Sequence, residues 1–204
     1  MIFFTADLHL GHKNIIKLAE RPFSSAEEMD ETLIANWNKK VKGGDTVYIA
    51  GDLINKSSDP KKYLARLKGK KVLICGNHDA GWLELIDSRE YFVGVEKLIE
   101  QSFCGHMVTL CHYPMIEWRA SRKGISKKLG YLIHGHIHKN TDKPEYYQLF
   151  RIPNALNAGV DINNFEPVTF EALILNNSRY KHALLTGTPD DERLSELESA
   201  LKLL

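Results

Sequence analysis

Short polar motifs that could bind metals or transfer protons follow strand-like apolar runs along this chain. The clearest lies in Lys71–Asp79, KVLICGNHD, where an apolar run ends at Gly76 and leads into Asn77, His78 and Asp79. Such a run is typical of a strand buried on both faces. Loops that follow the strands of α/β proteins often carry function. The motif therefore indicates a chemical site at the end of this strand.

Asp7 and His9 follow the apolar residues 2–6 in the same way. Side chains two residues apart point to the same face of an extended backbone, so both can reach one point in space. A carboxylate and an imidazole in this arrangement suit a divalent metal that prefers oxygen and nitrogen ligands. Alternatively, the two residues have no chemical role and are a solvated acid and a hydrogen-bonded histidine at the end of a strand.

Three further strand-like runs also end in chemically capable residues. Asp52 follows Gly51 after the run 46–50, and His112 directly follows the run 107–111. The run 131–133 leads through His134 and Gly135 to His136 and His138. Two buried imidazoles need polar partners, so this histidine pair has few purely structural uses. His134 precedes the glycine and is better interpreted as a core residue or as support for the site.

The composition excludes several classes of protein. Hydrophobic residues make up 43% and charged residues 26% of the 204 residues, as in an ordinary globular protein. The 27 cations nearly balance the 26 anions, which does not favour a nucleic-acid or membrane partner. The N-terminus lacks the features of a signal peptide, and no apolar run is long enough to cross a membrane. We expect a cytoplasmic protein whose three cysteines are buried, reduced thiols.

The order of elements predicts an α/β fold in a single domain, 1–204. Strands and helices alternate up to Asp79, with helices expected from Ser24 or Ser25 to about Gly43, over 60–67, and after Asp79 to Ile86. Residues 92–99 and 107–111 then read as successive antiparallel strands. The C-terminal residues 190–204 carry leucines on one face, which predicts an amphipathic helix docked on the same domain.

Four residues are candidates for contact with a substrate. His12 could touch a substrate or lie on the surface. The segment 119–128 contains Arg119, Arg122 and Lys123 and no acid, so it is either a solvated basic loop or a flap that faces an anionic substrate.

Together, the DLH, GD, GNHD, H and GHIH motifs resemble the calcineurin-like metallophosphoesterase superfamily over residues 1 to about 160, with features of a small bacterial or phage-type branch. The resemblance implies a four-layer α/β/β/α sandwich with mixed sheets and two divalent metals at one edge. Manganese is the first choice, and iron, zinc, nickel or cobalt also suit these ligands. The sequence departs from the family pattern at Asn55, which stands where family members often carry a second acid. This substitution affects the expected hydrogen bonds near Asp52 and removes no metal ligand.

The resemblance also implies a role for each motif. Asp7, His9 and His138 would hold the first metal, Asn77, His112 and His136 the second, and Asp52 would bridge both. A hydroxide between the metals would attack phosphorus in an in-line displacement. His78 would protonate the leaving oxygen, and Asp79 could orient His78 and raise its pKa.

We therefore expect a hydrolase of small phosphate esters, first of all a phosphodiesterase on nucleotide-like diesters. A phosphomonoesterase or protein phosphatase comes second and a nuclease third, because the near-neutral charge disfavours a long nucleic-acid track. A binding module that keeps this fold without catalysis is the alternative from another class, although a scaffold has no reason to keep the complete ligand set. Nothing in the sequence indicates an oligomeric state.

Overall fold

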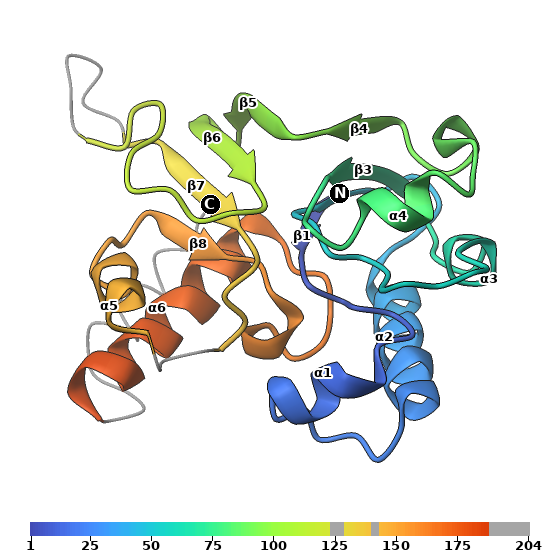
Figure 1. The fold of residues 1–204 in the computed structure, drawn as a ribbon. Coiled ribbons are helices and arrows are strands. Elements are labelled where there is room, and N and C mark those ends of the chain that lie inside the picture. Colours follow the sequence, from blue (N-terminus) through green and yellow to red (C-terminus); the bar gives the residue numbers. More distant parts are fainter. Residues whose placement is uncertain (123–128, 140–142, 188–204) are drawn as a thin grey trace.

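A computed structural model of the protein describes residues 1–122, 129–139 and 143–187 (Figure 1). The predicted helix at 190–204 and the residues from Lys123 to Lys128 lie outside the described part of the chain. The helices are α1 (Lys13–Leu18), α2 (Ala26–Lys40), α3 (Lys61–Leu64), α4 (Ala80–Leu83), α5 (Pro144–Phe150) and α6 (Phe170–Thr186), with 3₁₀ turns at Ser88–Glu90 and Val160–Ile162.

The described strands form two four-stranded sheets, ordered β1-β2-β3-β4 and β5-β6-β7-β8. All pairs in the first sheet are parallel, whereas the second sheet combines an antiparallel β5–β6 pair with parallel β6–β7 and β7–β8 pairs. The strands are β1 (Ile2–Thr5), β2 (Thr46–Ile49), β3 (Lys70–Ile74), β4 (Gly94–Glu96), β5 (Leu98–Phe103), β6 (His106–Cys111), β7 (Tyr131–His134) and β8 (Ala155–Asn157).

The two sheets pack face to face between helical layers (Figure 1). Phe3 and Phe4 are neighbours in β1, point to opposite faces of the first sheet, and are both buried. Phe3 belongs to the core cluster that holds Trp37 of α2, while Phe4 belongs to the cluster between the sheets. On the outer face of the second sheet, Leu132 packs in a cluster with Leu149 of α5. The order α2, first sheet, second sheet, α5 matches the predicted α/β/β/α sandwich.

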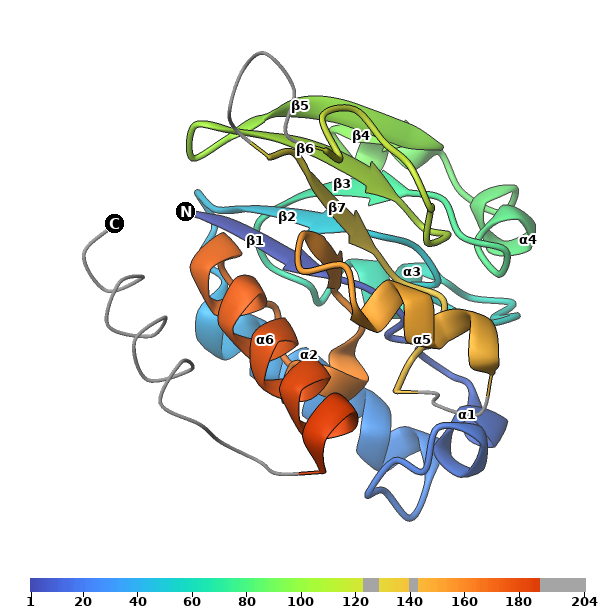
Figure 2. The same ribbon diagram turned by 90° about the vertical axis from the view of Figure 1, so that its left-hand side faces the viewer.

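Helix α6 lies along one side of the sandwich and contacts both β1 and β8 (Figure 2). Thr169 caps its first turn by accepting a hydrogen bond from the backbone N–H of Ala172, and Gly187 ends it with φ +73°. Sequence reasoning did not predict this helix. Within the described residues, no helix combines the length and apolar character needed to cross a membrane.

The sheet topology explains why distant motifs meet. Strands β1, β2 and β3 run in the same direction, so the loops that follow them leave from one edge of the first sheet. Strands β6 and β7 are parallel as well, and the loops after them leave from one edge of the second sheet. A backbone bridge between Ala6 and Gly159 joins the two sheets beside these loops. The five motifs therefore converge at one end of the sandwich.

The prediction of one strand over 92–99 was wrong. Residues Gly94–Glu96 add to the first sheet beside β3, and the chain crosses at Lys97 into the second sheet, where β5 begins at Leu98. The alternating exposure of β5 shows why its limits were missed: only one face of this strand is covered, so its apolar residues are dispersed.

Two predicted helices are shorter than expected. Helix α3 stops at Leu64 because the N–H groups of Arg66 and Leu67 bond three residues back, which tightens the last turn. Helix α4 stops at Leu83. The prediction of three buried thiols was also wrong: Cys104 is exposed in the tight turn between β5 and β6, and Cys75 and Cys111 are only partly buried.

Candidate metal centre

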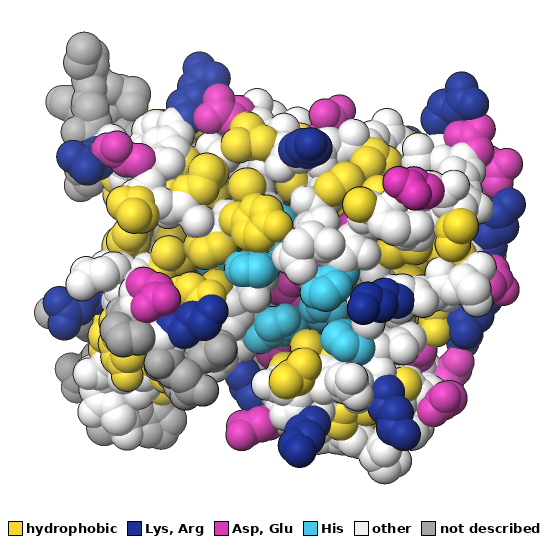
Figure 3. Space-filling model, viewed as in Figure 1, with side chains coloured by type: hydrophobic (Ala, Val, Ile, Leu, Met, Phe, Trp, Pro, Cys, Tyr) yellow, Lys and Arg dark blue, Asp and Glu magenta, His cyan; other side chains and the backbone are white. Residues whose placement is uncertain are grey.

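The predicted site residues come together in the loops at one end of the two sheets. Figure 3 shows histidine side chains gathered at the middle of one face of the molecule, next to hydrophobic side chains. A cavity of about 570 Å³ opens there. The predicted ligands and proton donor that line it are His9, Asp52, Asn77, His78, His136 and His138. Asp7 and His112 lie beneath this surface, fully buried.

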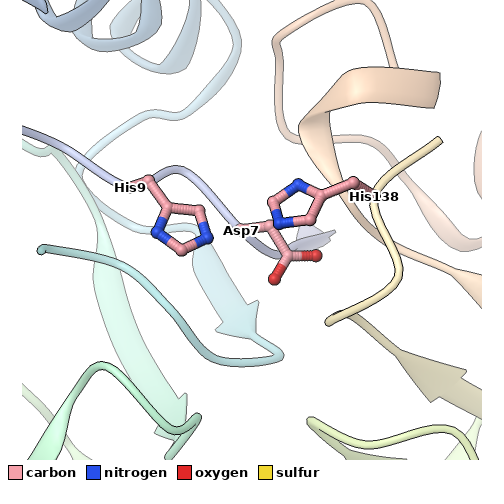
Figure 4. Close-up of side chains that lie close together, drawn as sticks. All are labelled: Asp7, His9 and His138. Carbon is pink, nitrogen blue, oxygen red and sulfur yellow. The ribbon is translucent and has the colours of Figure 1, made fainter. Parts of the chain in front are cut away.

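Asp7, His9 and His138 form one group of potential ligands. One donor atom from each lies within 4.8 Å of the others. Figure 4 shows their side chains turned toward one another, although His138 comes from the opposite sheet. Burial raises the pKa of the Asp7 carboxyl to about 6 and lowers the pKa of His9 well below its ordinary value. A carboxylate and a neutral imidazole at this point would both be stabilised by a cation.

Asp52 lies at the centre of the site. Its Oδ2 atom is 3.6 Å from His9 Nε2, 3.5 Å from His112 Nε2 and 3.9 Å from His78 Nε2. It also forms potential ligand groups with Asp7 and His112 and with His9 and His78. One carboxylate thus faces residues from both predicted ligand sets, which is the position that a bridging ligand requires.

Asn77, His112 and His136 gather close to Asp52 as well. His112 Nε2 is 3.1 Å from Asn77 Oδ1, and its Nδ1 is 2.9 Å from the carbonyl oxygen of Ala50. A proton on Nδ1 would bond this carbonyl and leave Nε2 free to act as a ligand. The His136 ring lies 5.1 Å from the His112 ring, centroid to centroid. Its backbone N–H donates to the Asp7 carboxylate, which ties the two ligand sets together.

The side chains present fit a pair of divalent cations. Both ring nitrogens of His9 are buried and lack a hydrogen-bond partner in the described structure. Leaving a buried polar atom unpaired is costly, so an electrophile that binds His9 would remove this cost. The donors are carboxylate, imidazole and amide groups without a thiolate, a set that suits manganese, iron, cobalt, nickel or zinc.

The backbone around the site is strained in several places. Asp7, His9, Asp52, His136 and His138 all have φ between +50° and +73°. Non-glycine residues rarely adopt this left-handed region, and such strain concentrates at functional sites. The loops after β1, β2 and β7 thereby aim side chains from three strand ends toward one point.

Glycines allow the loops to approach one another. At Gly76, a Cβ atom would lie 2.2 Å from Asp52 Oδ1, and at Gly51 it would lie 2.3 Å from His112 Nδ1. Gly51 also has φ +89°, which a side chain would strain. Any residue larger than glycine would therefore displace a predicted ligand.

Asp161 and Arg21 support His138, and sequence reasoning missed this arrangement. Asp161 Oδ2 is 2.8 Å from His138 Nδ1, while Asp161 Oδ1 accepts a hydrogen bond from Arg21 Nε at 2.8 Å. Arg21 also donates to the carbonyl oxygens of Asp7 and Leu8. Burial alone would lower the pKa of His138, but the hydrogen bond to Asp161 and the negative charges of Asp7 and Asp161 raise it overall.

The structure gives Asp79 a role other than orienting His78. Its Oδ2 accepts hydrogen bonds from the backbone N–H groups of Asp52 and Gly76, and its Oδ1 accepts from Leu53 N–H and Trp82 Nε1. These four bonds occupy the fully buried carboxylate and hold the loops after β2 and β3 together. The expected contact with His78 is therefore corrected. His78 is instead held through its backbone N–H, which donates to Asp52 Oδ1.

The substrate-binding candidates have different surroundings. His12 lines the cavity, and its ring lies 5.3 Å from the His9 ring. Arg119 and Arg122 are not among the residues that line it, and they pair with Glu100 and Glu117. The position and ion pairs of Arg119 and Arg122 do not support the interpretation of this segment as a flap that faces the substrate. Lys123 lies outside the described residues.

A cation that sequence reasoning did not single out lines the cavity instead. Lys139 follows the last predicted ligand by one residue and lies next to Glu20. Its amine donates to the Glu20 carbonyl oxygen at 3.1 Å. Asn55, the departure from the family pattern, has a buried Oδ1 without a hydrogen-bond partner in the described structure.

Comparisons with known proteins agree with this fold. The family model for the calcineurin-like phosphoesterase matches residues 1–105. An uncharacterized protein of Methanocaldococcus jannaschii, MJ1445, is 35% identical over 176 residues, which span 85% of this chain and 89% of the relative. The Gene 66 protein of Mycobacterium phage L5 is 30% identical over 165 residues, 67% of this chain and 76% of the phage protein.

A solved structure has the same architecture. The crystal structure of AQ665, a protein of unknown function from Aquifex aeolicus, matches with a TM-score of 0.63 and 29% identity over 82% of this chain and 94% of that one. The family match, together with the two-sheet sandwich and the aspartate and histidine groups that could hold metals, identifies the protein as a metal-dependent phosphoesterase. The chain belongs to the calcineurin-like phosphoesterase family.

Proposed function

We propose that this protein is a phosphodiesterase that acts on small, nucleotide-like diesters with two divalent cations, manganese foremost. The observation that supports a diester is the position of Asn77 and His78, which border two cavities at once. One is the 570 Å³ cavity of the metal centre, and the other is a cavity of about 450 Å³ that also contacts α4. A phosphate group held at this junction has room for a substituent in each cavity, and only a diester has two.

Each ligand has a place in this proposal. Asp7, His9 and His138 would hold one cation, and Asn77, His112 and His136 would hold the other. Asp52 would be the carboxylate that both cations share. When bound, such a cation pair supplies positive charge for the phosphoryl oxygens and lowers the pKa of a water molecule.

His78 supplies a proton to the leaving oxygen in this proposal. Its side chain is 35% exposed and lines both cavities, so a substrate can reach it. Its Nε2 is 3.9 Å from Asp52 Oδ2, so it lies beside the centre, and its backbone bond to Asp52 fixes its loop. Proton transfer from such a group contributes roughly 10²–10⁴-fold to a rate.

The larger cavity suits an organic substituent. Ile15, Leu18 and Ala19 of the α1 region form an apolar part of the wall of the cavity that the histidines also line. Leu18 is 74% exposed, so an apolar part of a substrate could cover it. An apolar wall would contribute to binding an aromatic or aliphatic group and would contribute little to binding a phosphate alone.

The test compares p-nitrophenyl phosphate with bis(p-nitrophenyl) phosphate, using protein that has been stripped of metal and reloaded with Mn²⁺. We expect kcat/KM to be at least tenfold higher for the diester. The same assay on Asp52→Asn protein controls for contaminating activity. A preference for the monoester would contradict the diesterase proposal and would favour a phosphomonoesterase.

A further inference from the structure

The two cavities that meet at Asn77 and His78 have walls of different chemistry. The larger one is bounded by the apolar residues of the α1 region. The one lysine among its described lining residues, Lys139, lies beside Glu20, whose carboxylate offsets its charge. The smaller cavity is lined by Lys56, Ser57 and Ser58 from the loop after β2, and by Trp82 and Leu85 from α4 and the residues after it. The substituents of a bound diester would therefore meet unlike surroundings.

Lys56 brings an uncompensated positive charge to the smaller cavity. Among the described residues, no carboxylate lies within 4 Å of its amine, in contrast to Lys139. The Lys56 side chain is exposed where it borders this cavity, so a substrate can reach its amine.

The loop that carries Lys56 is anchored to the site. The N–H of Leu10 donates to the Leu53 carbonyl oxygen, and the N–H of Asn55 donates to the Leu10 carbonyl oxygen. This pairing ties the loop to the segment that follows His9. Lys56 itself has φ +43°, an uncommon backbone conformation that recurs at functional sites. The loop therefore holds its side chains at a defined place, four residues after Asp52.

The serine hydroxyls add hydrogen-bond donors. Ser57 Oγ accepts a hydrogen bond from Asp59 N–H at 3.2 Å, which leaves its own proton free to donate. Ser58 is exposed beside it. An ammonium group with two hydroxyls forms a donor set that fits phosphate, sulfonate or carboxylate oxygens.

We propose that the cavity lined by Lys56, Ser57 and Ser58 is a subsite for an anionic substituent of the substrate. This inference rests on the proposed diesterase function and adds a substrate class to it. The scissile diester lies at the metal centre, one substituent covers the apolar α1 wall, and the other carries a second negative charge toward Lys56. Substrates with a second anionic group, such as a remote phosphate, are then preferred over neutral diesters.

The experiment uses two diesters that share a p-nitrophenyl leaving group. One carries a 2-methoxyethyl substituent, which is neutral and has no hydroxyl that could attack the phosphorus. The other carries a 2-sulfoethyl substituent, whose sulfonate is anionic and is not itself hydrolysed as a phosphate ester. With the Mn²⁺-loaded protein, we expect KM to be about fivefold lower for the sulfonate at low salt, the upper range for one exposed ion pair. The difference should shrink as salt is raised to 0.5 M, with little change in kcat.

Three variants assign the preference to this subsite. Lys56→Gln should bring the two KM values together, and Lys56→Arg should keep them apart because it retains the charge. Lys70→Gln is the matched control, since Lys70 is an exposed lysine at the start of β3, away from the loops of the site. It should preserve the preference of the unaltered protein.

The outcomes separate the two proposals. Equal KM values in the unaltered protein, or a preference that survives Lys56→Gln, would overturn the subsite while leaving a diesterase in place. If neither diester is hydrolysed and p-nitrophenyl phosphate is, the diesterase proposal fails and the subsite fails with it.

Discussion

His138 depends on a partner that lies far away in the sequence. Asp161 holds its Nδ1, and Arg21 in turn holds Asp161, although 140 residues separate the arginine from the aspartate. Partners of this kind orient metal-binding histidines and commonly change metal affinity 10–100-fold when they are removed. We propose that Asp161 has this positioning role for the metal that Asp7, His9 and His138 would hold.

Asp161→Asn should therefore weaken one metal site selectively. In a stepwise titration of metal-free protein with Mn²⁺, one binding step should become about 10–100-fold weaker, and the other should change little. Calorimetry measures both steps without relying on catalysis. An unchanged two-step isotherm would show that Asp161 does not support His138 as a ligand.

Substrates with different leaving groups distinguish the role of His78 from that of the metal ligands. His78→Ala removes no ligand in our assignment, so both cations should stay bound. A nitrophenolate leaves without help from an acid, whereas an alkoxide needs a proton, so the loss should be largest for the alkoxide, about 10²–10⁴-fold. The measurement compares kcat on two diesters that differ in leaving-group pKa. Equal losses would assign His78 to charge stabilisation, and loss of metal would make it a ligand or the support of one.

Much of the site at the residue scale could be predicted from local sequence. Asp7 and His9, or His136 and His138, stand within a few residues of each other after an apolar run and a turn, so their types and spacing indicated a shared site. Arg21 and Asp161 have no such local signature, because their pairing exists only after the chain has folded. For Asp79, in contrast, the local sequence indicated a contact that the structure does not contain. Proximity to His78 in sequence suggested a contact, but burial turned its carboxylate toward backbone N–H groups.

At the scale of elements, α6 and the chain that leads into β8 enclose a buried lysine amine. Lys181 of α6 donates hydrogen bonds to the carbonyl oxygens of Ile152 and Ala155, and its side chain is almost fully buried. Burial lowers the pKa of the Lys181 amine from an ordinary 10.5 to about 7. Between these pH values the unfolded chain binds a proton that the folded protein lacks.

The free energy of unfolding should therefore rise with pH across this window. Above the ordinary pKa the amine is neutral in both states, so the free energy of unfolding carries no penalty for burying its charge. This advantage is lost as pH falls toward 7, and the free energy of unfolding changes by at most about 1.4 kcal/mol per pH unit. Lys181→Met should flatten the rise, whatever its effect on stability at a single pH. Urea unfolding at pH 7, 8 and 9 measures both slopes. Identical slopes in the two proteins would show that Lys181 keeps its proton on folding.

The limits of elements were harder to predict than their order. The alternation of strands and helices up to Asp79 was correct because the parallel strands are buried on both faces and read as apolar runs. Beyond that point, residues 92–99 pass from one sheet to the other at Lys97, and no local feature of the sequence marks the crossing. Helix α6 contains buried Asn177 and Lys181, and these polar residues obscure its apolar stripe.

At the scale of the whole molecule, the sandwich brings the ends of strands from two sheets to one place. Neither sheet holds a complete centre, since His112, His136 and His138 come from the second sheet and the other predicted ligands come from the first. The bridge between Ala6 and Gly159 and the contacts of α6 with β1 and β8 hold the sheets together beside this centre. The activity should therefore depend on the fold as a whole and on cations that link its two halves.

The most direct test of this account is metal content measured together with diester hydrolysis in the unaltered protein and in Asp52→Asn. After chelation the unaltered protein should be inactive, and Mn²⁺, Ni²⁺ or Co²⁺ should restore hydrolysis as about two ions bind per chain. Asp52→Asn should bind both ions more weakly and should remain inactive while its fold, checked by circular dichroism, is retained. Undiminished hydrolysis by metal-free protein, or Asp52→Asn with normal metal content and rate, would contradict the account.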